Sequence, residues 1–342
     1  MDIPFASGRL GALASVVDQI ADWTVLPGYS RLGFAARRLL WREPAPPTAG
    51  LSRRRILVTG ASSGIGEALS EQLARAGASV LMGVRAIERG DSARGRIAAR
   101  TDAATAARLR PVRLDVADLE DITRFAGALE GDALDGLVHN AGVLTGERER
   151  SPQGHELTFA TAVLGPFVLT RALAGRLREA APSSVVFVSS GGMYTARLRA
   201  EDPELEASEF DGARFYAHAK RAQVVLASLF AERWEGSGVG FAAIHPGWVD
   251  TPGLAGSLPA FRRAVGPILR DPGAGADTAD WLLGRDLADC SGLFWHDRRP
   301  RPKHRLPWTR ESAADRERLW AGLLALAAEP ALRATAHPRT AR

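Results

Sequence analysis

The stretch that most constrains this chain is a glycine-rich turn, Thr59-Gly-Ala-Ser-Ser-Gly-Ile-Gly66, between a strand pattern and a helix pattern. Residues 55–59 before it form a short, β-branched apolar run, which is typical of a buried strand. Residues 67–76 after it repeat apolar side chains at helical spacing and stop at Gly77. Glycines in such a turn let the backbone approach a pyrophosphate, which the N–H groups and dipole of the helix N-terminus hold. The stretch therefore predicts the opening of a dinucleotide-binding βαβ unit.

The spacing of these glycines is Gly60-x-x-x-Gly64-x-Gly66, which differs from the G-x-G-x-x-G of the broader dinucleotide-binding class. A phosphate loop of the nucleotide-hydrolase kind is excluded, because no Gly-Lys-Ser/Thr follows. The expected cofactor contacts in this turn are Gly60, Ser62, Ser63, Gly64, Ile65 and Gly66.

Strand and helix patterns alternate over the rest of the chain, which favours a parallel sheet covered by helices on both faces. Further strands are expected at 79–84, 111–114, 135–139, 184–188, 238–244 and 292–295. Helices are expected within 89–109 and at 119–129, 154–180, 213–234, 276–283 and 312–328, with an irregular helical flap at 253–270. The sequence predicts one α/β domain of the doubly wound Rossmann type over residues 52–300. Residues 1–51 are an amphipathic helical extension with a Pro-rich linker, and residues 301–342 a C-terminal helix with a disordered tail.

Composition narrows the class of protein. The single cysteine, Cys290, excludes an intrachain disulfide and fits a reducing compartment. The chain has no apolar run of about 18 residues or more and no secretory signal pattern, so we expect a cytoplasmic protein. The seven histidines show no paired-ligand spacing, so no metal site is expected, and no nucleic-acid motif accompanies the basic charge.

The basic residues gather at the two ends of the chain: residues 1–55 carry eight arginines against four acids. Leu13, Val16, Val17, Ile20 and Trp23 form an apolar stripe, with Asp18 and Asp22 at other positions. A second segment combines Arg31, Arg37 and Arg38 with Phe34, Leu39 and Trp41. Two alternatives remain open. The extension packs against the body or a second subunit of a homo-oligomer, or residues 10–42 make peripheral contact with the anionic inner face of a membrane.

Tyr216-Ala-His-Ala-Lys220 places a tyrosine and a lysine one helical turn apart on the same face. An ammonium group beside a phenol lowers the pKa of the phenol and makes it a workable general acid/base. A tyrosine and a lysine would rarely occur at this spacing by chance, because the chain has three tyrosines and only two lysines. Ser190 ends the strand at 184–188, where doubly wound sheets place catalytic groups.

In this order of motifs the chain resembles the short-chain dehydrogenase/reductase superfamily. The motifs are Thr59–Gly66, Asn140-Ala-Gly142, Ser190, Tyr216 with Lys220, and Pro246-Gly247. Within the superfamily, residues 188–193, 245–253, 275–278 and 291–298 resemble the branch of dehydrogenase/reductase member 12 and its bacterial relatives. The resemblance implies that Tyr216 exchanges a proton with the substrate oxygen, that Lys220 holds the nicotinamide ribose, and that Ser190 orients the substrate. It also implies cofactor contacts from Asp115, Asn140, Ala141, Gly142, Pro246, Gly247, Val249 and Thr251.

The chain departs from the family pattern at two positions. His139 replaces the first asparagine of Asn-Asn-Ala-Gly, and we interpret it as structural. Ala162 occupies the place of the asparagine that the family uses with the lysine to hold a relay water. Three further interpretations concern other residues: His218 as a surface residue, residues 195–212 as an exposed acidic loop, and Asp250 as a loop cap.

The predicted function is hydride transfer between a nicotinamide cofactor and an apolar alcohol or carbonyl compound. An acid that would hold the ribose of NAD is missing after the strand at 79–84, where Val84 is followed by Arg85. A guanidinium suits a phosphate, so we expect NADP(H), with NAD(H) less favoured. The alternative is a nucleotide-binding module with little or no turnover, acting as an interaction or regulatory protein. The absent asparagine at Ala162 is its main support.

Overall fold

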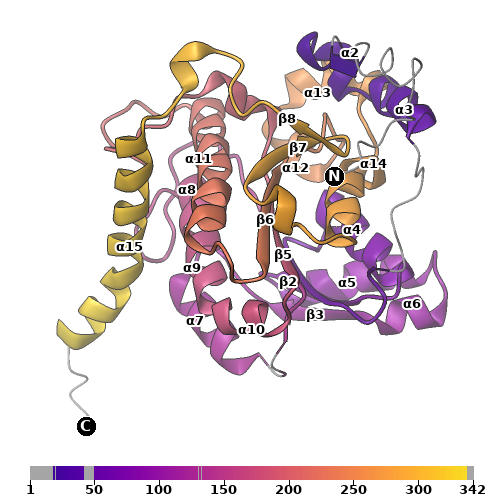
Figure 1. Ribbon diagram of the computed structural model, residues 1–342, viewed down its shortest axis with the longest axis horizontal. Helices are drawn as coiled ribbons and strands as arrows, with labels where there is room; N and C mark the ends of the chain where they lie inside the picture. Colours follow the sequence, from indigo (N-terminus) through magenta and orange to yellow (C-terminus); the bar gives the residue numbers. More distant parts are fainter. Residues whose placement is uncertain (1–17, 20, 42–49, 130, 132, 337–342) are drawn as a thin grey trace.

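One mostly parallel sheet organises the chain, in a computed structural model that describes residues 18–19, 21–41, 50–129, 131 and 133–336 (Figure 1). Within these residues the strand order is β3-β2-β1-β4-β5-β6-β7-β8, and only β8 runs antiparallel to its neighbour. The strands are β1 (Arg55–Thr59), β2 (Ser79–Val84), β3 (Leu109–Arg113), β4 (Gly136–His139), β5 (Ser183–Val188), β6 (Val239–Ile244), β7 (Leu293–His296) and β8 (Arg299–Arg301). This order confirms the doubly wound fold.

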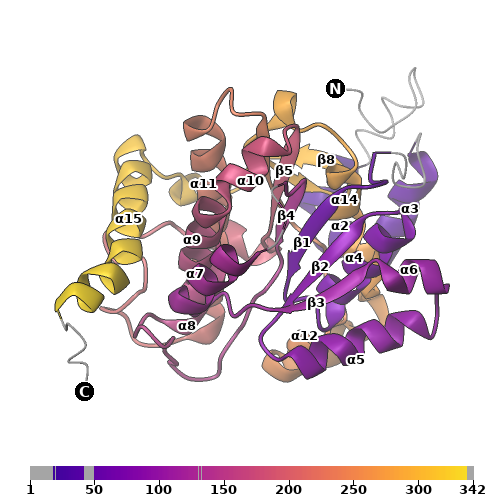
Figure 2. The same cartoon turned by 90° about the horizontal axis from the view of Figure 1, so that it is seen from below.

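Helices cover both faces of the sheet, as Figures 1 and 2 show. The helices are α2 (Leu26–Tyr29), α3 (Arg31–Leu40), α4 (Gly64–Arg75), α5 (Ile87–Ala98), α6 (Ala103–Ala107), α7 (Leu119–Ala128), α8 (Leu157–Phe159), α9 (Gly165–Ala172), α10 (Ala174–Glu179), α11 (Gly212–Arg233), α12 (Pro252–Ser257), α13 (Pro259–Val265), α14 (Pro272–Leu283) and α15 (Ala313–Ala336). Alternate strand residues enter different cores. Leu57 packs with α7, α9 and α11, whereas Ile56 and Val58 pack with α4, α5 and α14.

The segment 154–180 is divided, although the sequence predicts one helix. A π-helical turn, η1 (Ala160–Leu164), separates α8 from α9, and the N–H of Gly165 bonds to the carbonyl of Ala160. Pro166 follows at once and has no N–H to donate to the carbonyl four residues earlier, which favours an irregular turn at this point. This leaves Ala162 inside an irregular turn that packs against α11.

Two features near the C-terminus differ from the sequence prediction. The antiparallel strand β8 was not expected; its Pro300 pairs opposite Trp295 at the edge of the sheet, where a proline can be accommodated. Helix α15 continues past Pro330 to Ala336, where we expected a disordered tail. A proline removes one hydrogen bond and bends a helix without necessarily ending it. No helix in the described part of the chain is long and apolar enough to cross a membrane.

Among the described residues between 18 and 23, the pattern of buried and exposed side chains is the reverse of the predicted one. Asp18 and Asp22 are only 3% and 4% exposed, whereas Trp23 is 67% exposed. Leu13, Val16, Val17 and Ile20, which belong to the predicted apolar stripe, lie outside the described residues. The aspartates are buried because arginines meet them: Asp18 binds Arg37, Arg299 and Arg301, and Asp22 binds Arg305.

The second segment of the extension is also pinned to the body by buried charges. Asp297 accepts from Arg37 of α3 and from Arg270, whose nitrogens lie 2.6 and 2.9 Å from its oxygens. The same Arg270 guanidinium donates to the carbonyl of Gly28 at 2.9 Å and to that of Tyr29 at 3.0 Å. Over residues 18–41, the described part of the extension therefore packs on the body, which is one of the two alternatives left by the sequence.

Residues 195–212, the insertion before α11, are packed against the body, whereas the sequence suggested an exposed acidic loop. Leu198 and Leu205 are buried, and Glu204 accepts from the N–H of Glu156 at 2.7 Å. His218 is buried below this segment and accepts from the N–H of Arg199 at 3.0 Å, so its interpretation as a surface residue was wrong.

Candidate active site

The predicted site residues gather at the carboxyl ends of neighbouring parallel strands. The glycine turn follows β1, Asn140 follows β4, Ser190 follows β5 and Pro246 follows β6. In a doubly wound sheet this edge is where ligands bind, because the order of the strands reverses there. The strands of the first and second halves meet at β1 and β4, so the glycine turn lies at the reversal.

The glycine turn has no room for side chains at two of its glycines. Gly60 has a φ of 66°, and a Cβ built on it would lie 2.8 Å from the Cα of Ala141. A Cβ on Gly66 would lie 2.5 Å from Nδ2 of Asn140. The turn can therefore pack directly against the Asn140-Ala-Gly142 segment and bring the start of α4 close to a ligand.

Asn140 joins β4 to the glycine turn. Its Nδ2 donates to the carbonyl oxygens of Thr59 at 2.9 Å and Gly60 at 3.2 Å. The hydroxyl oxygen of Thr59 in turn accepts from the N–H groups of Asn140 and Ala141, both at 3.1 Å. With its amide committed to the backbone, Asn140 acts as a brace, the role that the resemblance implied.

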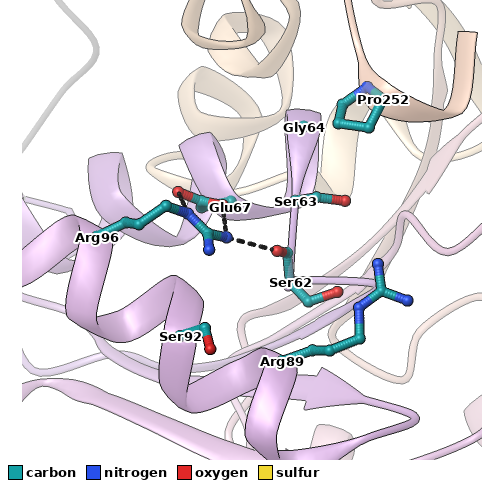
Figure 3. A pocket seen from close by; sticks show the side chains of 8 residues that line it. All are labelled: Ser62, Ser63, Gly64, Glu67, Arg89, Ser92, Arg96 and Pro252. Atoms are coloured by element: carbon teal, nitrogen blue, oxygen red, sulfur yellow. Dashed lines mark hydrogen bonds and ion pairs between the residues drawn. The ribbon is translucent and has the colours of Figure 1, made fainter. Parts of the chain in front are cut away.

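The N-terminus of α4 opens onto a pocket with a volume of about 380 Å³ (Figure 3). Ser63 stands at the capping position, yet its side chain makes no capping hydrogen bond. The pocket is lined by Ser62, Ser63, Gly64, Glu67, Arg89, Ser92, Arg96 and Pro252. Helix α5 supplies its basic side, and a helix N-terminus beside cations is suited to a phosphate group.

The arginines of this pocket differ in their partners. Arg96 donates to Glu67 and to the carbonyl of Ser62, as the dashed lines in Figure 3 mark. Arg89 and the neighbouring Arg85 are exposed and make no salt bridge within the described residues. Arg89, which the sequence reasoning missed, lines the pocket together with Ser62, Ser63 and Gly64, whereas Arg85 does not line it. A cation in the first turn of the helix after β2 was the signal that could have found it.

Ser190, Tyr216 and Lys220 come together between β5 and α11. The Ser190 hydroxyl is close enough to the Tyr216 phenol to lower its pKa by a hydrogen bond. The Lys220 ammonium lies 5.4 Å from the centroid of the Tyr216 ring. Its Nζ also lies beside Gly142, 3.6 Å from a Cβ built there. The site thus combines the phenol of Tyr216, the hydroxyl of Ser190 and the ammonium group of Lys220 beside the Asn140-Ala-Gly142 segment.

Burial is the main influence on the pKa values of Tyr216 and Lys220. It raises the pKa of Tyr216 to about 12, against the opposing hydrogen bond from Ser190. It lowers the pKa of Lys220 to about 7. The sequence predicts that Lys220 lowers the pKa of Tyr216, but burial and the hydrogen bond from Ser190 set that pKa, and the Lys220 ammonium donates to the carbonyl of Val188 and to Gln223.

The loop after β6 and the flap close another side of the site. Thr251 caps α12 by accepting from the N–H of Leu254 at 3.1 Å, and its methyl group faces Gly64. Val249 is buried and pairs with Arg270, which also donates to the carbonyl of Pro246 at 3.4 Å and lies against Gly247. The predicted flap consists of α12, α13 and η3 (Gly266–Ile268), and Ser257 ties it to the carbonyl of Leu144 at 2.9 Å.

Other predicted residues have local partners. Asp115 is half-buried after β3 and accepts from the N–H of Ala117 at 3.0 Å. Asp250 forms an exposed pair with Arg262 at 2.7 Å, which links its loop to α13. His139 lies 2.8 Å from the hydroxyl of Thr170, and burial lowers its pKa to about 3, in agreement with a structural role. The described residues contain no cluster of potential metal ligands.

A model of the short chain dehydrogenase family matches residues 54–259, which include the glycine turn, Ser190, Tyr216 and Lys220. The chain belongs to the short-chain dehydrogenase family. The resemblance inferred from the motifs is therefore confirmed, and an oxidoreductase with a nucleotide-binding Rossmann fold is established as its class.

Known proteins extend the similarity beyond the matched segment. Dehydrogenase/reductase SDR family member 12 of Bos taurus is 37% identical over 272 residues, covering 77% of this chain and 82% of that protein. Retinol dehydrogenase 12 of Bos taurus is 34% identical, covering 71% of this chain and 77% of its own length. Among solved structures, the Pseudomonas aeruginosa RhlG/NADP active-site complex is 25% identical with a TM-score of 0.59, covering 72% of this chain and 96% of that one.

Proposed function

We propose that this protein is an NADP(H)-dependent oxidoreductase that interconverts an apolar alcohol and its carbonyl compound, with Tyr216 as the general acid/base. The observation that carries the proposal is the convergence of Ser190, Tyr216 and Lys220 beside the glycine turn at the carboxyl edge of the sheet. The alternative of a module without turnover rested on Ala162, and family membership with this complete group of three favours the enzyme.

The residues present fit a nicotinamide dinucleotide. The turn has no space for side chains at Gly60 and Gly66, and Ser63 makes no capping hydrogen bond that would occupy the N–H groups at the start of α4. When bound, a reduced nicotinamide would supply the hydride. Gly60, Ser62, Ser63, Gly64, Ile65 and Gly66 would hold the pyrophosphate, with Asp115, Asn140, Ala141, Gly142, Pro246, Gly247, Val249 and Thr251 lining the remaining length.

The chain's own residues account for the proton. With a pKa of about 12, the Tyr216 phenol is protonated at neutral pH and is ready to donate to the oxygen of a carbonyl substrate as that oxygen becomes an alcohol. Ser190 holds the same oxygen through its hydroxyl. The Lys220 ammonium, 5.4 Å from the centroid of the Tyr216 ring, would contact the ribose hydroxyls.

The preference for NADP(H) is supported by the basic residues after β2. Arg85 and Arg89 follow the strand, and no carboxylate lies at the strand end, where it would bind the ribose of NAD. Neither arginine forms a salt bridge within the described residues, so both guanidinium groups can bind a phosphate. NADP is the ligand of the RhlG complex, a structural neighbour of this chain.

An apolar substrate is supported by the flap. Leu254, Leu258, Phe261, Val265 and Ile268 are half-buried between the site and solvent, and Leu269 is buried. Retinol dehydrogenase 12 is among the relatives, so retinoids belong in the substrate panel.

The test is NADPH-dependent turnover with a panel of aldehydes, ketones, retinoids and sterols, followed by absorbance. Tyr216→Phe keeps the ring and removes the transferable proton, so turnover should fall by about 100-fold or more while NADPH binding survives. Tyr194→Phe is the matched control, because the Tyr194 hydroxyl donates to the carbonyl of Pro302, away from the site. Turnover by Tyr216→Phe near that of the parent protein would remove Tyr216 from the mechanism.

We further infer that the outward face of α3 makes peripheral contact with an anionic membrane surface. Leu32 and Leu39 are seven residues apart on one side of α3 and are 63% and 87% exposed. Arg31 and Arg38 are exposed on the same helix, whereas Phe34 and Arg37 face the body. Exposed leucines flanked by arginines suit the interface of an anionic bilayer.

A further inference from the structure

The buried ammonium group of Lys220 is held by two neutral oxygen atoms. Its Nζ donates to the carbonyl of Val188 at 2.8 Å and to Oε1 of Gln223 at 3.0 Å. Lys220 and Gln223 are 2% and 0% exposed. The oxygen of the amide must face the lysine, since an ammonium group has only donors.

Gln223 lies on the same side of α11 as the tyrosine and the lysine. Tyr216, Lys220 and Gln223 are separated by four and three residues, which is the spacing of one helical face. The turn η1, which packs against α11, contains Ala162, whose methyl group offers no side-chain acceptor. The amide that the family pattern has at position 162 is therefore absent, while an amide bonded to the lysine is present at 223.

Among the described residues, no carboxylate contributes to the pKa shift of Lys220. Tyr216 is the titratable group that faces it on α11, and β5 and η1 contribute no ionisable side chains. His139 at the end of β4 is held neutral by burial, with its ring bonded to Thr170. Burial accordingly lowers the pKa of Lys220 to about 7, and a hydrogen bond to the charged form opposes this decrease.

We propose that Gln223 is a positioning residue for the reaction, holding the Lys220 ammonium charged and beside Tyr216, where Ala162 offers no side-chain acceptor. The inference rests on the proposed function for its catalytic meaning. It predicts that the protonation of Lys220 depends on the side chain at 223 even when no substrate is present.

The chain has only two lysines, Lys220 and Lys303, so lysine labelled with ¹³C at Cε allows direct NMR titration of each ammonium group in the full-length protein. Gln223→Met keeps the length of the side chain and removes the acceptor, so the pKa of Lys220 should fall by about 1 pH unit. Gln223→Glu keeps the shape and adds a negative charge, so the pKa should rise. Lys303, which donates to the hydroxyl of Ser228, is the internal reference.

A matched control removes a different glutamine hydrogen bond. Gln72 donates to the carbonyl of Gly273 at 3.0 Å on the opposite face of the sheet, so Gln72→Met should leave the Lys220 titration unchanged. If Gln223→Met fails to fold, the near-isosteric Gln223→Glu still decides the proposal. An unchanged pKa of Lys220 in Gln223→Glu, or a shift in the same direction in both variants, would overturn it.

The pH profile of carbonyl reduction is the second readout, measured with the best aldehyde or ketone of the panel. Turnover that needs charged Lys220 declines as the pH rises through the pKa of Lys220. This decline should move to lower pH in Gln223→Met and to higher pH in Gln223→Glu. If no panel compound is turned over, the proposed function fails, but the NMR titration still tests the role of Gln223.

Discussion

Arg85 and Arg89 are close in sequence but differ in their relation to the glycine turn. Arg85 follows β2 directly, whereas Arg89 extends from α5 into the pocket beside Ser62 and Ser63 (Figure 3). Both are exposed, so a phosphate could reach either without breaking an ion pair among the described residues. Its position after the strand predicts that Arg85 binds the 2′-phosphate of NADP(H). The structure adds Arg89 as a second candidate.

Removing either guanidinium should weaken the preference for NADP(H). Loss of charge-assisted hydrogen bonds is expected to raise the Kd for NADPH by about 10-fold or more in Arg85→Ala and Arg89→Ala, with little change for NADH. Fluorescence titrations with both cofactors give the comparison. Arg94→Ala is the control, since Arg94 is half-exposed on α5 and lies 3.8 Å from Asp91. Tighter binding of NADH than NADPH by the parent protein would contradict the cofactor assignment.

At the scale of elements, α3 and the residues before α2 are attached to the body by charge pairs with residues near the C-terminal end of the sheet. Asp18 binds Arg37 of α3 together with Arg299 and Arg301 of β8, and all of these side chains are largely buried. Burial raises the pKa of Asp18, but hydrogen bonds and attraction from Arg301 and Arg37 outweigh it, so the net pKa is lowered. Removing one partner from such a cluster leaves buried charge without compensation.

Asp18→Asn should therefore destabilise the protein by about 3–5 kcal/mol, measured by urea unfolding at pH 7. Because the folded-state pKa of Asp18 lies below its unfolded value, its contribution is complete above about pH 4 and is lost as the pH falls through the folded-state pKa. The variant should thus lose less stability on acidification than the parent. Asp91→Asn, at an exposed position, is expected to change little. Equal unfolding midpoints for the two variants would show that the charge cluster does not anchor the extension.

At the scale of the whole molecule, one surface combines apolar exposure with cationic charge. Trp23, Leu26, Leu32 and Leu39 are all more than half exposed and belong to the extension. The body buries Asp18, Asp22, Tyr29, Phe34 and Trp41 of this extension and leaves Trp23 and the three leucines outside. Deleting the extension would also remove the buried charge cluster, so substitutions on the outward face give a cleaner test of membrane contact.

Full-length protein should sediment with anionic phospholipid vesicles at low salt and be released at high salt, since Arg31 and Arg38 of α3 are exposed. Leu32→Asn combined with Leu39→Asn should abolish sedimentation without lowering the melting temperature. Leu324→Asn, on exposed α15 surface, serves as the control. Protein that remains in the supernatant at low salt would end the membrane proposal, and a concentration-dependent dimer lost in the double variant would assign this face to a second copy.

Local periodicity and short motifs determined much of this protein from the sequence. The bounds of β1 and β2 match the apolar runs, and the glycine turn, Asn140, Ser190 and Tyr216-x-x-x-Lys220 all fall at one edge of the sheet. These features could be predicted because each depends on residues within one or two turns of the chain. Family membership follows from the same motifs.

Only the tertiary structure decided which polar groups are buried together. Asp18 is buried because arginines about 280 residues later surround it, and the reversed polarity of the extension cannot be seen in its own periodicity. His218 is buried because the preceding insertion folds back over α11. The Lys220 ammonium turns to Val188 and Gln223 because β5 and the helix face meet there. Spacing along the chain fixes which side of an element a residue occupies, whereas its partner, and hence its charge state, depends on what packs against that side.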